Sequence, residues 1–302
     1  MSVPVYAEKL FAVSGLPVTN SLLTGWIVAA FFICIAIASR TRALVPRGFQ
    51  NAIEALIEFM LDFMDQVTHD RARSRRFLPF VGTLFMLILV SNWMGLLPGF
   101  GTIGMWEIIE GKRELIPFFR PATSDLNMTL ALGITSVVVS HVIGISTIGF
   151  FRHWGKFIQV EGIWRALKTF GKKPIGEAAL GLFTSLIDLA VGFLEIISEC
   201  AKMLSLSLRL FGNIFAGEVL LSVLSHLAAF LLPTPFMFME VIVGIVQALV
   251  FSILTLVYLT LATEPPHGEH GHEADDIAHK EEASLPPGAI APHSVGEEEV
   301  FL

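Results

Sequence analysis

The sequence predicts an all-α membrane protein with about five transmembrane helices, one interfacial amphipathic helix, and a long, strongly tilted helical hairpin at the carboxyl-terminal end. Of its 302 residues, 54% are hydrophobic and only 16% are charged. This balance excludes a water-soluble globule. Several charge-free runs also reach the roughly 20 apolar residues that a helix needs to cross a bilayer core of about 30 Å.

The apolar runs place five spans in one polytopic membrane domain, residues 1–262. The spans are expected near residues 20–39, 77–98, 126–151, somewhere within 177–232, and 236–262. The first run is interpreted as an uncleaved anchor and not as a signal peptide, because arginines follow it directly.

Residues 48–68 have the pattern of an amphipathic helix. Apolar side chains recur at helical spacing on one stripe and acidic side chains lie on the opposite face. The stripe consists of Phe49, Ile53, Leu56, Met60, Met64 and Val67, and the acids are Glu54, Glu58, Asp62 and Asp65. Such a helix lies either in the membrane interface or packed against the spans, and the pattern leaves both alternatives open.

Basic residues predict the orientation, since short loops rich in Lys and Arg stay in the cytoplasm. Residues 40–76 hold seven arginines, and the segment 152–173 is also basic. The loop 99–125 has three basic and four acidic residues and is bordered by Trp93 and Trp106, as expected at an outer interface. We therefore expect the amino terminus outside and the carboxyl terminus in the cytoplasm.

The last residues, 263–302, have the composition of a disordered cytoplasmic tail. They carry ten acidic residues and one lysine. Five histidines there are compatible with metal binding, but the spacing of the HExxH motif is absent, so neither a metal nor a cofactor is expected. The rest of the chain is nearly neutral, which argues against nucleic-acid binding. No GxxxxGK[ST] motif occurs, so no catalytic ATP site is expected in this chain.

Residues 175–232 form a run of 58 residues without proline. As one helix it would be about 87 Å long, so it must tilt, bend or break. It carries Arg209 at membrane depth, where an ionised group costs about 2.5 to 3.5 kcal/mol and usually marks an ion path or an ion pair. No acid lies three or four residues from Arg209, and Glu218, nine residues on, points to the opposite side of a regular helix.

Helical spacing groups further polar residues with these charges. Arg209 shares a stripe with Ser198, Lys202, Ser205, Asn213, Ala216 and Leu220. On the last span one face holds Glu240, Gly244, Gln247, Phe251 and Tyr258. His141 and His226 stand alone in apolar runs, which is more typical of packing residues than of proton relays.

Two strings carry a resemblance to a known family. SLSLRLFGNIFAGE, residues 205–218, and VIVGIVQALVFSILTLVYLTLA, residues 241–262, resemble subunit a of the F-type ATP synthases. NWMGLLP at 92–98 and PATSDLNMTLAL at 121–132 are similar to other recurrent blocks of that family. The resemblance covers roughly residues 20–262, and an arginine followed by LFGN and then AGE within an apolar helix is a specific signal.

The resemblance implies the stator half of a rotary proton motor in a bacterial inner (plasma) membrane. Its partners would be a rotor ring of small hairpin c subunits with buried carboxylates, peripheral-stalk b subunits, the rest of the complex and the lipid bilayer. Arg209 matches the essential arginine of the family. Asn213, Glu218, Glu240 and Gln247 match positions of the half-channel from the proton-rich side, and Glu195 and Ser198 lie towards the release side.

The sequence departs from the family in one respect. Many relatives have one His and one carboxylate where this chain has Glu218 and Glu240. Two neighbouring acids repel, so one of them would hold a proton, and the sequence leaves open which one. A secondary transporter would show paired repeats, which are absent, and a purely structural scaffold would not keep an arginine at membrane depth.

Overall fold

The computed structural model describes residues 7–13, 15–39, 48–97, 103–109, 112–155, 175–228 and 231–263. All of them belong to one unit, Met1–Thr263, and the acidic tail makes up a second unit, Glu264–Leu302, which lies outside the described residues. The basic segments 40–47 and 156–174 also lie outside them. The predicted orientation and the predicted state of the tail therefore stay predictions.

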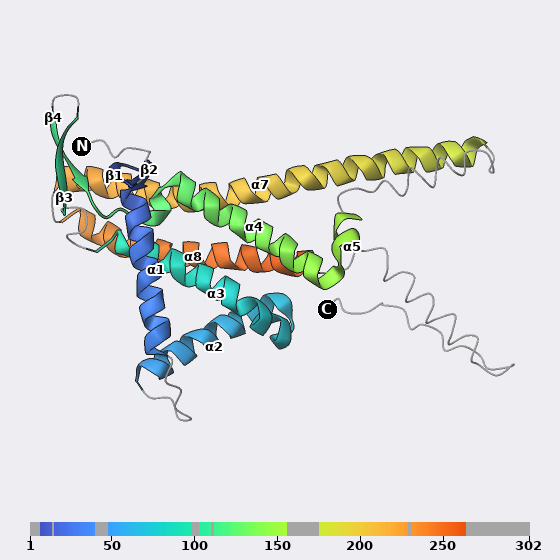
Figure 1. Ribbon diagram of the computed structural model, residues 1–302, viewed down its shortest axis with the longest axis horizontal. Coiled ribbons are helices and arrows are strands. Elements are labelled where there is room, and N and C mark those ends of the chain that lie inside the picture. The colour runs from blue at the N-terminus through green and yellow to red at the C-terminus, as the bar shows by residue number, and fades with distance from the viewer. Residues whose placement is uncertain are drawn as a thin grey trace, which may run out of the picture. The chain divides into compact units, whose positions relative to one another are not determined.

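The first unit is a bundle of helices (Figure 1). Among the described residues, five helices are long and apolar enough to cross a membrane. They are α1 (Asn20–Ala38), α3 (Arg71–Met94), α4 (Leu126–Ile148), α7 (Ile175–Leu227) and α8 (Pro233–Thr263). The predicted all-α membrane class with about five spans is confirmed.

Polar side chains cap the amino-terminal ends of three of these helices. Thr19, Asp70 and Asp125 each accept a hydrogen bond from a backbone N–H in the first turn of α1, α3 and α4. The Asp70 cap explains one difference from the prediction: α3 begins at Arg71, six residues before the expected span at 77. Its first turns carry the arginines that hydropathy alone assigns to a loop.

Helix α2 (Phe49–Thr68) packs against α3 and α8 with the predicted apolar stripe. Met60 and Met64 on this stripe are buried. On the acidic face, Arg71 binds Asp62 at 2.8 Å and Asp65 at 2.6 Å and also contacts Glu58. These contacts support the packed alternative, whereas a position in the membrane interface stays a prediction.

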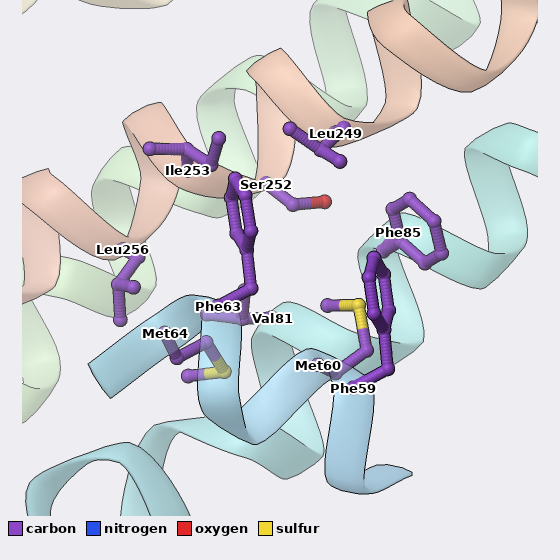
Figure 2. A pocket seen from close by; sticks show the side chains of 10 residues that line it. All are labelled: Phe59, Met60, Phe63, Met64, Val81, Phe85, Leu249, Ser252, Ile253 and Leu256. Carbon is purple, nitrogen blue, oxygen red and sulfur yellow. The ribbon is translucent and has the colours of Figure 1, made fainter. Parts of the chain in front are cut away.

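A small pocket lies where α2 meets α3 and α8 (Figure 2). Its walls are apolar except for one serine, and they are formed by Phe59, Met60, Phe63, Met64, Val81, Phe85, Leu249, Ser252, Ile253 and Leu256. The lining residues supply no ionisable group, so the pocket is a feature of helix packing and not a site for chemistry.

Two antiparallel hairpins were absent from the predicted elements. One pairs β1 (Lys9–Val13) with β2 (Leu16–Thr19), and the other pairs β3 (Gly104–Ile109) with β4 (Lys112–Pro117). Position 104 requires a glycine, because the two strands approach closely there and a methyl group would overlap the Ile116 carbonyl. Both hairpins lie in connecting segments near the start of α1 (Figure 1), where hydropathy gives no signal for strands.

The side chain of Asn20 connects these hairpins at the start of α1. It donates a hydrogen bond to the Pro117 carbonyl at the end of β4, at 3.4 Å, and another to the Glu8 carboxylate, also at 3.4 Å. The chain then passes from β4 through a short 3-10 turn, η2 (Ala122–Ser124), into α4. The residues between β4 and α4 are thereby held beside the helices.

Helix α7 is continuous over 53 residues, a length of about 80 Å. The sequence predicted that such a helix must tilt, bend or break to fit a bilayer. The helix is not broken between Ile175 and Leu227, so tilting and bending are the two alternatives left. Its second half packs against α4 and α8, while its first half projects past the other helices (Figure 1). Pro233 begins α8 at the position that proline prefers, which completes the predicted helical hairpin.

Close packing fixes the crossing of α4 and α7. A methyl group at Gly133 would overlap the Ser207 hydroxyl and the Met203 carbonyl, so the two backbones approach closely there. After α4 the chain turns into the short helix α5 (Phe150–Gly155). Leu210 of α7 packs in one apolar cluster with Ile88 of α3 and Phe251 of α8.

Candidate functional site

The polar residues of α7 and α8 form two separate clusters, one on each side of Arg209 along α7. The carboxyl-terminal cluster contains Asn213, Glu218, Glu240 and Gln247, which the sequence predicted, together with Arg120, which it did not. The amino-terminal cluster contains His141, His153, Glu199, Lys202 and Tyr258.

Asn213 and Gln247 connect α7 to α8 in the carboxyl-terminal cluster. The Asn213 amide donates a hydrogen bond to the Gln247 side-chain oxygen at 2.7 Å. Gln247 is 5% exposed and lies on the face of α8 that the sequence predicted as polar, together with the buried Glu240 and Gly244. The predicted grouping of Asn213 with Gln247 is therefore present in the structure.

Glu218 forms an ion pair with Arg120, a residue of the segment between β4 and α4. The Arg120 Nε donates to Glu218 Oε1 at 3.0 Å and the Arg120 Nη2 donates to Oε2 at 3.0 Å. The arginine side chain is only 3% exposed, whereas that of Glu218 is 26% exposed. The backbone N–H of Arg120 also donates to the Thr24 hydroxyl of α1 at 3.3 Å.

Sequence reasoning missed Arg120 because its partner lies 98 residues away along the chain. It was counted only as one of the basic residues of the loop 99–125. The one available signal was its position, directly before the PATSDLNMTLAL block that carries part of the family resemblance.

Glu240 is buried at the start of the α8 face and lies against Gly217 of α7. A methyl group at Gly217 would overlap the Glu240 carboxyl, so the glycine leaves the space that this carboxyl fills. Glu218 and Glu240 thus reach neighbouring positions, yet Glu218 is paired with Arg120. Among the residues that the structure describes, no basic group lies within ion-pair distance of Glu240.

Arg209 lies on an exposed face of α7. Its Nη2 donates a long hydrogen bond of 3.5 Å to the Ser205 hydroxyl one turn earlier. Within the described part of the chain no carboxylate is in ion-pair distance of it, and the prediction that Glu218 is not its partner is confirmed. Leu204 and Leu208 beside it are 50% and 52% exposed, and the space next to Gly212 is open.

The amino-terminal cluster begins about three turns before Arg209. Lys202 binds Glu199 at 2.6 Å, and its Nζ lies 5.3 Å from the centre of the Tyr258 ring. The other oxygen of Glu199 is 3.5 Å from His141 Nε2 of α4. His141 Nδ1 is in turn 3.0 Å from His153 Nε2 of α5.

The expectation that His141 is a packing residue stays a prediction, although both of its ring nitrogens face titratable groups. His226 agrees better with that expectation, since its ring bonds the Ser222 carbonyl of its own helix. Of the predicted release-side residues, Glu195 is half-buried and Ser198 is exposed, and their roles stay predictions.

The described residues contain no group of three or more His, Cys, Asp or Glu side chains that could hold a metal ion. The two histidines and Glu199 therefore form a chain of contacts and not a ligand set. The free cysteines, Cys34 and Cys200, are exposed on α1 and α7.

Fold and clusters together define a multi-pass helical membrane protein with titratable groups on both sides of a membrane-embedded arginine, an arrangement typical of ion-translocating proteins. The model of one protein family, the ATP synthase A chain, matches residues 21–260. The chain therefore belongs to the ATP synthase subunit a family, the proton-translocating stator subunit of the F-type enzyme. It is a multi-pass membrane component of that complex.

Individual relatives agree with the family match. The ATP synthase subunit a of Moorella thermoacetica is 29% identical over 265 residues, which cover 87% of this chain and 97% of the relative. That of Syntrophobacter fumaroxidans is 32% identical over 80% of this chain and 83% of the relative. The subunit a of Trichlorobacter lovleyi is 30% identical over 82% and 89% of the two chains.

Proposed function

We propose that this chain provides two offset half-channels to the carboxylate of a rotor ring, and that Arg209 separates them. The observation that carries the proposal is the place of Arg209: exposed on α7, between two clusters of titratable groups, with no carboxylate of the described chain to neutralise it. A cation in that position is available to a carboxylate on a partner that moves past it.

Electrostatics gives Arg209 its role. A ring carboxylate about 4 Å from the guanidinium gains about 4 kcal/mol at an effective dielectric constant of 20. Beside Arg209 the ring site is therefore charged, and in lipid it must be neutral, since bare charge is costly there. A proton cannot cross directly from one half-channel to the other, so a potential worth about 2.3 kcal/mol per charge per 100 mV drives rotation.

The uptake half-channel is assigned to the carboxyl-terminal cluster. Glu240 takes up and passes on the proton, and Gln247 and Asn213 connect it towards Arg209 across their 2.7 Å hydrogen bond. Glu218 binds the Arg120 guanidinium through both of its carboxylate oxygens, and in this proposal the pair stays in place while Glu240 carries the proton. The contact that supports this assignment is the Arg120 guanidinium, which binds Glu218 and, among the described residues, is not within ion-pair distance of Glu240.

The partners follow from the same geometry. The exposed Arg209 face of α7 fits a ring of small hairpin c subunits, and the other exposed apolar faces fit lipid and the peripheral-stalk b subunits. ATP is made or hydrolysed in other subunits of the complex. We place the amino terminus outside and the carboxyl terminus in the cytoplasm of a bacterial plasma membrane, on the distribution of arginines alone.

Arg209→Ala tests the proposal in inverted membrane vesicles. We expect ATP-driven proton pumping to be abolished while the complex still assembles. Arg209→Lys should restore little of it, because a buried ammonium can lose its proton and lacks the planar fork of arginine. Arg73→Ala is the matched control, since Arg73 makes one 3.5 Å ion pair on the exposed start of α3.

Proton pumping at ordinary rates in Arg209→Ala vesicles would mean that Arg209 is structural. The same conclusion would follow if Arg73→Ala and Arg209→Ala lowered pumping equally, since the loss would then report reduced assembly.

A further inference from the structure

The amino-terminal cluster connects three helices through titratable side chains. Glu199 comes from α7, His141 from α4 and His153 from α5. The Glu199 carboxylate bonds Lys202 through one oxygen at 2.6 Å and approaches His141 through the other at 3.5 Å. The two imidazoles are 3.0 Å apart, nitrogen to nitrogen, with their rings nearly perpendicular.

We propose that Glu199, His141 and His153 form a proton-release relay that leads from the Arg209 region to the end of α4. This inference rests on the proposed function, of which it specifies the release half-channel. It assigns to His141 and His153 a role in proton transfer that neither the sequence motifs nor the family resemblance gave them.

The geometry suits proton transfer along hydrogen bonds. Imidazole accepts a proton at one nitrogen and donates one from the other, so a proton that arrives at His141 Nε2 from Glu199 leaves from Nδ1 towards His153 Nε2. His153 in turn releases a proton from Nδ1 to water at the end of α4, so both imidazoles are neutral again once the proton has left. Each ring must then exchange its ring proton to return to its starting tautomer. The His141 to His153 distance of 3.0 Å lies within the range of about 2.6 to 3.2 Å that proton transfer requires, and the Glu199 to His141 distance of 3.5 Å has to shorten to reach it.

The fold also makes room for this chain of contacts. A Cβ atom at Gly144 of α4 would lie 2.8 Å from Cε1 of His153. It would also lie 2.7 Å from the Ala262 carbonyl oxygen of α8, so only a glycine leaves enough space there. His153 itself is 3% exposed, although it lies on a helix of only six residues. A buried polar ring in a fitted space next to a second imidazole is a costly arrangement for simple packing.

Other charged groups face the relay from the helices packed around it. Lys202 of α7 binds Glu199, Glu195 lies one turn before Glu199, and Tyr258 of α8 lies under the Lys202 ammonium. Arg209 lies on α7 beyond Lys202. The Lys202 ammonium binds one oxygen of Glu199, and the other oxygen faces His141 Nε2.

The test uses the whole complex in inverted vesicles, whose cytoplasmic side faces the buffer. Passive proton conduction is measured after the catalytic sector is stripped off, as a function of outside pH. We expect His141→Gln, which keeps a hydrogen-bonding side chain, to lower proton conduction about tenfold. This is a smaller effect than the loss of an acid–base group in an enzyme, because water can partly replace the imidazole. Adding imidazole to the buffer should restore part of the loss.

The controls separate a relay from a structural contact. His226→Gln on α7, the helix that carries Glu199, should leave conduction unchanged, since His226 bonds only its own helix in the described contacts. Glu199→Gln should lower conduction like His141→Gln, and His153→Gln serves if His141→Gln does not assemble. Unchanged conduction in His141→Gln, or a loss that imidazole does not restore and that is the same at every pH, would overturn the relay. An absence of conduction in the unaltered complex would instead contradict the proposed function itself.

Discussion

Individual contacts in the structure distinguish two glutamates that look alike in the sequence. Glu218 and Glu240 are both acids in apolar helices, but a nearly buried arginine binds the first through both of its carboxylate oxygens. Glu240 instead fills the space beside Gly217. This difference in contacts supports the proposal that Glu240 carries the proton while Glu218 stays paired with Arg120.

This difference predicts unequal effects of neutralising the two acids. Glu240→Gln should lower passive proton conduction by about tenfold or more, because it removes the carrier. Arg120→Met combined with Glu218→Met should keep most of the conduction, because an ion pair replaced by apolar side chains is often tolerated. Arg120→Met alone or Glu218→Met alone should lower conduction more than the double variant, since each leaves the charge of the other residue without its partner. Equal losses in Glu240→Gln and the double variant would contradict the assignment.

At the scale of elements, the junction of α2 and α3 is held by charge outside the bundle core. The Ser74 hydroxyl, together with the Arg71 guanidinium, holds the pKa of the Asp65 carboxyl below its ordinary value of 3.8, although partial desolvation opposes this. A carboxyl whose pKa is lower in the folded state stabilises the fold above its unfolded pKa. That stabilisation is lost as the pH falls below about 3.8.

We therefore expect acid to loosen this junction. The thermal unfolding midpoint of the detergent-solubilised chain should fall between about pH 6 and about pH 3, and Asp65→Asn should make this fall smaller. Glu54→Gln is the control on the same helix, since Glu54 is exposed and bonds only Gln50 in the described contacts. If both variants show the same pH dependence, Asp65 does not stabilise the junction.

At the scale of the whole molecule, the exposed face of α7 predicts where a partner binds. Leu208 is 52% exposed beside Arg209, whereas Leu210, two residues on, is fully buried. In a chain whose Cys34 and Cys200 are replaced by serine, Leu208→Cys should crosslink to a ring subunit that carries a matching cysteine, and Leu210→Cys should not. Equal yields from both positions, or none from either, would argue against this face as the ring contact.

Much of this architecture could be read from the sequence because a bilayer imposes simple rules. Apolar runs located the spans, and helical spacing grouped Glu240 with Gln247 and separated Glu218 from Arg209. The Arg120 to Glu218 pair and the contact of His141 with His153 could not be read, since each depends on how separate helices and loops dock. The two hairpins were missed because their strands are only four to six residues long and mostly apolar, so that hydropathy does not separate them from the neighbouring apolar runs.

The unbroken course of α7 has a mechanical consequence for the proposed motor. A ring that turns past Arg209 pushes sideways on the stator, and between Ile175 and Leu227 no proline or break offers a hinge where that push could be absorbed. The helix then behaves as a stiff elastic beam, braced by α4 and α8 over one half. If the proposed ring pushes on Arg209, we therefore expect the helix to bend elastically as one piece and not to fold at a hinge between Ile175 and Leu227.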